Sequence, residues 1–304
     1  MALVILLYAL FASLFGLAKA TLEYGEAFFL IGSRMAFAGL AMFLFQLARN
    51  PKALRVSPKK VYLVFLMGFF AIYLTNIAEI WGLSHMISAK ACLIYSLSPF
   101  LSALFSFFLF KESLSFRQIL ALCVGFLGLG PCFFSDLSSV FRGKVSFSLA
   151  ELVLLVAVVS SVYGWIVLKK LVWEGEEEEK CSPITANAYG MMLGGVLALI
   201  HSYLAGESWT PLPVSQPYFF IRNTILLCLI SNIICYNLYG YLLKRFSATL
   251  ISFAGLVTPL FASLFGWFFL GESVNGNFFL SLALFSLGLF LFHQEELKIS
   301  RSGR

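Results

Sequence analysis

Charged residues are scarce in this sequence. They make up 12% of the 304 residues, whereas 60% are hydrophobic; an ordinary soluble domain contains about 25% charged and roughly 45–50% apolar residues. The mean hydropathy is +0.91. This composition argues against a soluble enzyme, a disordered chain and a disulfide-bonded miniature domain. It predicts an integral membrane protein.

The sequence also lacks the motifs of metalloproteins and ATPases. The three histidines, His85, His201 and His293, form no cluster, and the cysteines show neither a CxxC nor a Cys/His spacing. There is no GxxxxGK[ST] loop. We therefore expect no metal, no cofactor and no ATP hydrolysis. The cysteines are interpreted as buried apolar fillers: Cys92, Cys123, Cys132, Cys181, Cys228 and Cys235.

Long apolar runs occupy most of the chain, and each is long enough for a membrane-spanning helix of about 20 residues. They cover residues 2–20, 27–48, 61–83, 88–110, 116–134, 148–169, 184–204, 219–242, 248–270 and 276–293. Ala18-Lys19-Ala20 resembles a signal-peptidase site, but no positively charged segment precedes the first run. We predict that this run is retained, in an all-α membrane protein of ten transmembrane helices.

Basic residues fall mainly in alternate loops. With the N-terminus in the cytoplasm, 15 of the 21 lysines and arginines lie inside, five lie outside, and Arg34 lies within the second span. The positive-inside rule then places both termini in the cytoplasm. The acidic run 174–180 is interpreted as a solvated linker between two halves. No basic stripe interleaved with aromatic residues lies outside the spans, so the net charge of +6 does not indicate nucleic acid.

The second half of the chain repeats the first. Residues 98–129 align with residues 258–289 at a constant offset of 160, without gaps. The matches include Pro99 with Pro259, Glu112-Ser113 with Glu272-Ser273, and Leu127-Gly128-Leu129 with Leu287-Gly288-Leu289. We predict two five-helix repeats in one membrane domain, covering residues 1–137 and 138–304.

An odd number of helices per repeat inverts the second copy in the membrane. The loop charges agree, because Lys111 and Arg117 become Gly271 and Asn277, whereas Ser84-His85 become Lys244-Arg245. Inverted repeats are typical of secondary transporters, which bind substrate near the midplane and work by alternating access.

Together these residues resemble the EamA branch of the drug/metabolite transporter superfamily, over essentially the whole chain. More loosely, the chain is similar to the S-adenosylmethionine transporters of obligate intracellular bacteria within that superfamily. The resemblance implies that Glu112 and Glu272 cap or lock the turn that follows them.

Pro99 and Pro259 fall at the centres of the fourth and ninth runs. Proline lacks a backbone N–H and clashes with the carbonyl four residues earlier, so the carbonyls of Tyr95 and Gly255 are freed. Either the kinks are static or they bend during alternating access. Their presence in both repeats favours the second interpretation, in which the prolines are hinges.

Glu79 lies in the third run with Tyr73 and Asn76, at a spacing of three that shares a helical face. An ionised side chain at membrane depth costs roughly 2.5–3.5 kcal/mol and usually faces a functional cavity. The alternative is an interfacial acid paired with Lys90 or His85. Arg34 either binds a substrate carboxylate, pairs with a carboxylate or extends to the interface. We predict a substrate site formed by Glu79, Asn76, Tyr73, Arg34, Tyr95, Trp165, Tyr236 and Tyr239.

An acid among aromatic rings suits a cation, because π faces attract positive charge. With the resemblance, this favours S-adenosylmethionine as the substrate, exchanged for S-adenosylhomocysteine, and it implies a bacterial inner membrane as the location. An exporter of amino acids or amphipathic cations, an intramembrane lipid-modifying enzyme and a structural subunit are the alternatives. The expected partners are the small-molecule substrate and the lipid bilayer, and homodimerisation is left open.

Overall fold

The computed structural model describes residues 2–110, 115–128, 148–173, 181–243, 251, 255, 257–271 and 276–302. Glu112, Glu272 and the acidic run 174–180 lie outside these residues. Every named secondary-structure element of the described part is a helix, which confirms the all-helical prediction. An isolated bridge pairs Gly25 with Val214.

The helices follow the predicted apolar runs closely. The first half contributes α1 (Ala2–Thr21), α2 (Ala27–Arg49), η1 (Pro51–Leu54), η2 (Pro58–Lys60), α3 (Val61–Met67), η3 (Gly68–Leu74), α4 (Thr75–Ser84), α5 (Ser88–Tyr95), α6 (Ser98–Phe110) and α7 (Phe116–Leu127). The second contributes α10 (Leu149–Trp173), α11 (Pro183–Leu204), α12 (Pro217–Leu227), η5 (Cys228–Cys235), α13 (Tyr236–Leu242), α15 (Val257–Leu270) and α16 (Gly276–Ser302). Within the described residues, six continuous helices are long and apolar enough to cross a membrane.

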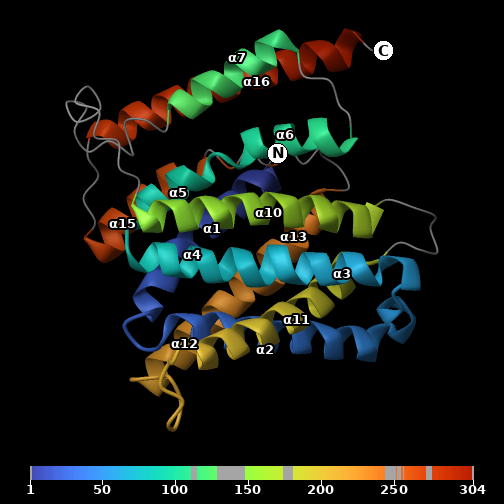
Figure 1. The fold of residues 1–304 in the computed structure, drawn as a ribbon, viewed down its shortest axis with the longest axis vertical. Coiled ribbons are helices and arrows are strands. Elements are labelled where there is room, and N and C mark those ends of the chain that lie inside the picture. Colours follow the sequence, from blue (N-terminus) through green and yellow to red (C-terminus); the bar gives the residue numbers. More distant parts are fainter. Residues whose placement is uncertain are drawn as a thin grey trace.

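The helices lie side by side in layers. Figure 1 shows α2, α11 and α12 at one edge of the molecule, α3, α4 and α10 in the middle, and the α7–α16 pair at the opposite edge. The layers are held by helix pairs distant in sequence, chiefly α2 with α11, α7 with α16 and α1 with α15.

Glycines allow α11 to pack closely against two neighbours. A Cβ added to Gly195 would lie 2.4 Å from the backbone nitrogen of Ala36 in α2, and one added to Gly194 would lie 2.6 Å from Cγ2 of Ile72 in η3. Small residues at such crossings are typical of membrane helix pairs, whose backbones approach for van der Waals packing.

Two of the membrane-length helices contain a π-helical segment. The helix Pro58–Ser84 contains η3, and the helix Pro217–Leu242 contains η5. The two segments begin at Gly68 and Cys228, separated by the offset that relates the two halves of the sequence. A π-segment within an α-helix frequently marks a functional site.

The run 88–110 is two helices rather than a single kinked one. The break at Ser96-Leu97 separates α5 from α6, so Pro99 lies in the first turn of α6 instead of mid-helix. Proline is tolerated there because its missing N–H would have no intrahelical acceptor. The carbonyl of Tyr95 accepts a hydrogen bond from Ser98 Oγ at 2.6 Å, as expected for a carbonyl freed by the proline.

The second proline has the same place in its helix. Pro259 is in the first turn of α15, which begins at Val257. The carbonyl of Gly255 accepts a hydrogen bond from the backbone N–H of Thr258 at 2.9 Å. Both prolines therefore follow helix starts, which corrects the prediction that they lie at the centres of continuous helices.

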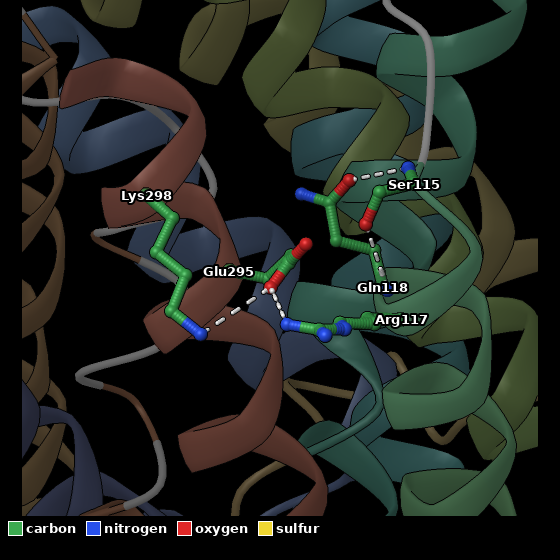
Figure 2. Close-up of polar contacts among 5 residues, drawn as sticks. All are labelled: Ser115, Arg117, Gln118, Glu295 and Lys298. Atoms are coloured by element: carbon green, nitrogen blue, oxygen red, sulfur yellow. Dashed lines mark hydrogen bonds and ion pairs between the residues drawn. The ribbon is translucent and has the colours of Figure 1, made fainter. Parts of the chain in front are cut away.

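The start of α7 is set by a capping box. Ser115 Oγ accepts from the Gln118 backbone N–H at 3.2 Å, and Gln118 Oε1 accepts from the Ser115 N–H at 2.8 Å. Figure 2 shows this box beside an ion pair between Arg117 Nη1 and Glu295 Oε2 at 3.5 Å, with Lys298 Nζ 3.9 Å from the same oxygen. The beginning of α7 thus lies next to the end of α16.

Side-chain contacts show which loops share an end of the bundle. At one end, Lys60 Nζ donates to the Leu171 carbonyl at 3.3 Å and Thr185 Oγ1 to the Ala53 carbonyl at 2.9 Å. At the other end, Lys90 forms an ion pair with Glu151, and Lys19 Nζ donates to the Met86 carbonyl at 3.1 Å. The basic loop 49–60 therefore shares an end with residues 169–173 and 181–185.

The cysteines agree with the sequence interpretation with one exception. Cys92, Cys181, Cys228 and Cys235 are buried free thiols, whereas Cys123 is exposed on α7. Cys132 lies outside the described residues.

Candidate functional site

A cavity in the interior of the bundle brings the two halves of the chain together. Its walls come from α1, α2, α4, α5 and α6 of the first half and from α10, η5, α13 and α15 of the second. Seven of the eight residues predicted to bind substrate line this cavity: Arg34, Asn76, Glu79, Tyr95, Trp165, Tyr236 and Tyr239.

The acidic wall of the cavity is formed by Glu79 on α4. Its side chain is part-buried, and its Oε2 accepts a hydrogen bond of 2.6 Å from the Tyr95 hydroxyl on α5. His85 instead bonds to the Trp81 carbonyl, and Lys90 pairs with Glu151. Glu79 thus presents its carboxylate to the cavity, which favours the cavity interpretation over an interfacial anchor.

The basic wall is formed by Arg34 on α2, which is 5% exposed. Its Nη2 donates to Asn76 Oδ1 at 3.1 Å. Asn76 Nδ2 donates to the Ile72 carbonyl at 2.8 Å and to the Tyr236 hydroxyl at 3.3 Å. Arg34 therefore does not extend to the membrane interface but is held inside by a network that joins α2, α4 and α13.

An aromatic wall lies on the side of the second half. The ring of Trp165 on α10 stacks on Tyr239, with centroids 4.0 Å apart and planes at 24°. Tyr236 is tilted against the same indole at 5.1 Å. These rings offer π surface for a planar or cationic group of a ligand.

Tyr73 is not among the residues that line the cavity. Its hydroxyl bonds to His201 Nδ1 on α11 at 2.8 Å. Side chains three apart are neighbours on a helix, but six residues turn about 240°, so Tyr73 and Glu79 point about 120° apart. Tyr73 also belongs to the π-segment η3, which changes the register further.

Several lining residues were missed by the sequence analysis. Tyr8 on α1 lines the cavity, and its place as a tyrosine inside an apolar run was a usable signal. The hydroxyl residues carried no such signal, because serine and threonine in membrane helices commonly bond to their own backbone. The lining hydroxyls are Thr75, Ser96, Ser98, Ser102, Ser161, Ser231 and Thr258.

The cavity can bind a small molecule that carries a positive group, a negative group and a flat ring. Among the described residues, no cluster of histidine, cysteine, aspartate or glutamate is arranged to hold a metal ion. The arrangement is one of recognition by charge, hydrogen bonds and stacking.

Comparison with known proteins identifies the family of the chain. Residues 1–130 and 148–293 both match the EamA-like transporter family. The chain belongs to the EamA-like transporter family. This confirms the resemblance inferred from the repeated Pro and Glu-Ser pattern, and it makes the chain a multi-pass membrane protein of a transporter family.

The relatives carry a more specific name. The S-adenosylmethionine/S-adenosylhomocysteine transporter of Chlamydia trachomatis serovar L2 is 37% identical over 290 residues, which cover 95% of this chain and 87% of the relative. The protein of the same name from Chlamydia muridarum is 37% identical over 291 residues, covering 95% and 90%. One solved crystal structure matches this chain with a TM-score of 0.67, over 95% of this chain and 94% of the chain in that structure. The two sequences are 18% identical, so the match shows the fold alone.

Proposed function

We propose that this chain is a secondary transporter that takes up S-adenosylmethionine across a bacterial inner membrane in exchange for S-adenosylhomocysteine. The observation that carries the proposal is 37% identity over 95% of the chain to transporters of that name. The cavity supports it, because S-adenosylmethionine carries a sulfonium, an ammonium, a carboxylate and a purine. Glu79, Arg34 and Trp165 supply a partner for each kind of group.

The proposed architecture is ten transmembrane helices in two inverted repeats, residues 1–137 and 138–304. The two matches to one family model support a duplicated chain. The hydrogen bond between Asn76 and Tyr236 joins residues that are 160 positions apart, which is the repeat offset. Equivalent residues can contact each other only near the axis that relates the repeats, so the cavity would lie on that axis. Secondary transporters bind substrate in such a position.

Uptake into proteoliposomes tests the proposed activity. Vesicles that contain the purified chain and internal S-adenosylhomocysteine should accumulate labelled S-adenosylmethionine, and empty vesicles should not. The exporter of amino acids or amphipathic cations predicts instead that internal amino acids or amphipathic cations drive the exchange. A lipid-modifying enzyme or a structural subunit predicts no accumulation under any of these conditions.

The two prolines are proposed to keep their helices broken during alternating access. In Pro99→Ala, the new N–H can donate to the Tyr95 carbonyl, so α5 and α6 can join in one helix. One recovered hydrogen bond of about 0.5–1.5 kcal/mol would reduce the bent population, and hence transport, roughly 2- to 13-fold. Initial uptake rates check this for Pro99→Ala, Pro259→Ala and the double variant, with equal amounts inserted. Wild-type rates in all three would make the prolines packing residues only.

Both termini and the loop 49–60 are proposed to face the cytoplasm. The end of the bundle that holds this loop also holds Lys169 and Lys170, so the more basic end faces inward. Cysteine introduced at Ser57 or Ser302 should resist an impermeant maleimide in intact cells and react after lysis. Efficient labelling in intact cells would contradict the inverted-repeat arrangement.

The labelling experiment has a matched control, and the native thiol at the basic end should react slowly. Ser215 is exposed at the opposite end, where its backbone N–H donates to the Tyr24 carbonyl, so cysteine there should react in intact cells. Cys181 at the basic end is buried, and burial raises the pKa of its thiol to about 11. Its thiolate fraction at neutral pH is therefore small, and it should react slowly.

A further inference from the structure

Arg34 and Glu79 are opposite charges in one cavity that do not pair with each other. Their charges interact electrostatically, yet none of the ion pairs among the described residues joins them. At about 1.5 Å per residue, they lie roughly 8–11 Å from Ala27 and Ser84, the nearer ends of their helices. Charge at such depth is costly and usually functional.

Each charge is held in place by a neutral neighbour instead of by the other charge. Arg34 Nη2 is bonded to Asn76, and Asn76 is itself fixed to the Ile72 carbonyl. Glu79 is bonded to the Tyr95 hydroxyl from a different helix. The two groups therefore line one cavity with opposite charges and without an ion pair between them.

Arg34 also has an unused donor. Its Nε has no hydrogen-bond partner, although Arg34 is only 5% exposed. A guanidinium typically binds a carboxylate through two parallel N–H groups. The hydrogen-bonding capacity of the Arg34 guanidinium is therefore not used up by the protein.

We propose that Arg34 and Glu79 bind the α-amino-acid end of the substrate, the guanidinium of Arg34 the carboxylate and Glu79 the ammonium. The assignment rests on the proposed function. In an α-amino acid, the ammonium and the carboxylate are both attached to the α-carbon. A site with one negative and one positive side chain that do not pair with each other can bind both groups. S-Adenosylmethionine and S-adenosylhomocysteine share this end and differ at sulfur. Arg34 and Glu79, which we call the clamp, can therefore bind both partners of the exchange. The sulfonium is left to the π face of Tyr236, and the purine to Trp165.

Analogues that lack one or all of the charged groups test this assignment. The binding of labelled S-adenosylmethionine is measured in competition with three compounds: S-adenosylhomocysteine, decarboxylated S-adenosylmethionine and 5′-methylthioadenosine. Arg34→Gln should weaken the binding of S-adenosylhomocysteine by roughly 10- to 150-fold, which is the loss expected for one charged hydrogen bond. The same variant should not weaken the decarboxylated analogue, which has no carboxylate to lose. Arg222→Gln, at an exposed position on α12, is the matched control.

The outcomes separate the clamp from the transport proposal. If wild-type vesicles take up S-adenosylmethionine but Arg34→Gln weakens all three competitors equally, the role of Arg34 is structural and the clamp is wrong. If wild-type vesicles take up none, the proposed function itself fails. Should Arg34→Gln not fold, the wild-type protein still decides, because the clamp requires it to bind the decarboxylated analogue at least tenfold more weakly than S-adenosylmethionine. Equal binding of the two would overturn it.

Discussion

The Glu79→Gln variant is expected to bind S-adenosylmethionine roughly 10- to 150-fold more weakly than the wild-type protein. Glutamine keeps the size of the side chain and can still accept from the Tyr95 hydroxyl, but it removes the negative charge. A hydrogen bond to a charged group contributes about 1.5–3 kcal/mol, and each 1.4 kcal/mol is a factor of ten. Competition binding in detergent or uptake in proteoliposomes measures the change.

Two variants serve as controls for Glu79. Tyr73→Phe removes a hydroxyl of the same membrane-length helix that contacts His201 outside the cavity, so substrate affinity should not change. Tyr239→Phe removes a hydroxyl from the position equivalent to Glu79 in the second half and should cost less than the charge. Wild-type affinity and gradient-driven uptake in Glu79→Gln would refute a role in the site. A variant that exchanges normally but no longer responds to a pH gradient would assign Glu79 to proton coupling instead.

Removal of the Trp165 ring is expected to weaken the binding of the adenosyl substrates by roughly 5- to 150-fold. Stacking of a base on an aromatic side chain contributes about 1–3 kcal/mol, and the indole is held in place by Tyr239 at 4.0 Å. Trp165→Ala deletes the platform, whereas Trp165→Phe keeps a smaller one and should lose less. The affinities of both variants for S-adenosylhomocysteine measure the effect, because this substrate has the purine but no sulfonium.

S-Methylmethionine distinguishes stacking from a general disturbance of the cavity. This compound has the amino-acid end and a sulfonium but no purine. Its weak competition should fall less in Trp165→Ala than that of S-adenosylhomocysteine. An equal loss for both compounds would mean that Trp165 shapes the cavity or binds the sulfonium, and that the purine lies elsewhere.

The helical class and most helix positions could be predicted from the sequence, because each depends on local pattern. Apolar runs of about 20 residues specify membrane helices, since the bilayer leaves no other partner for the backbone. The break between α5 and α6 was less accessible. Pro99 marks the vicinity, but which of the nearby peptide units leaves the helix depends on the Ser98 hydroxyl and on the neighbouring helices.

The candidate site was predicted in its residue types and only partly in its membership. Glu79 and Arg34 could be selected from the sequence, because a charge inside an apolar run is expensive wherever the chain folds. Tyr73 could not be separated from Asn76 by spacing, since a shift of three residues preserves a face only approximately. The π-segment η3, which alters that face, has no signature in local sequence alone.

The sequence by itself determined that the chain is a helical membrane protein with isolated charges inside its apolar runs, and its self-similarity predicts a duplication. These properties follow from composition, run length and self-similarity. Only the tertiary structure decided that Arg34 is bonded to Asn76 while Glu79 is bonded to Tyr95, so that two opposite charges stay unpaired. The physical reason is that such partnerships join helices far apart in the chain. Their distances and directions depend on how closely glycine-lined crossings such as α2–α11 bring the backbones together.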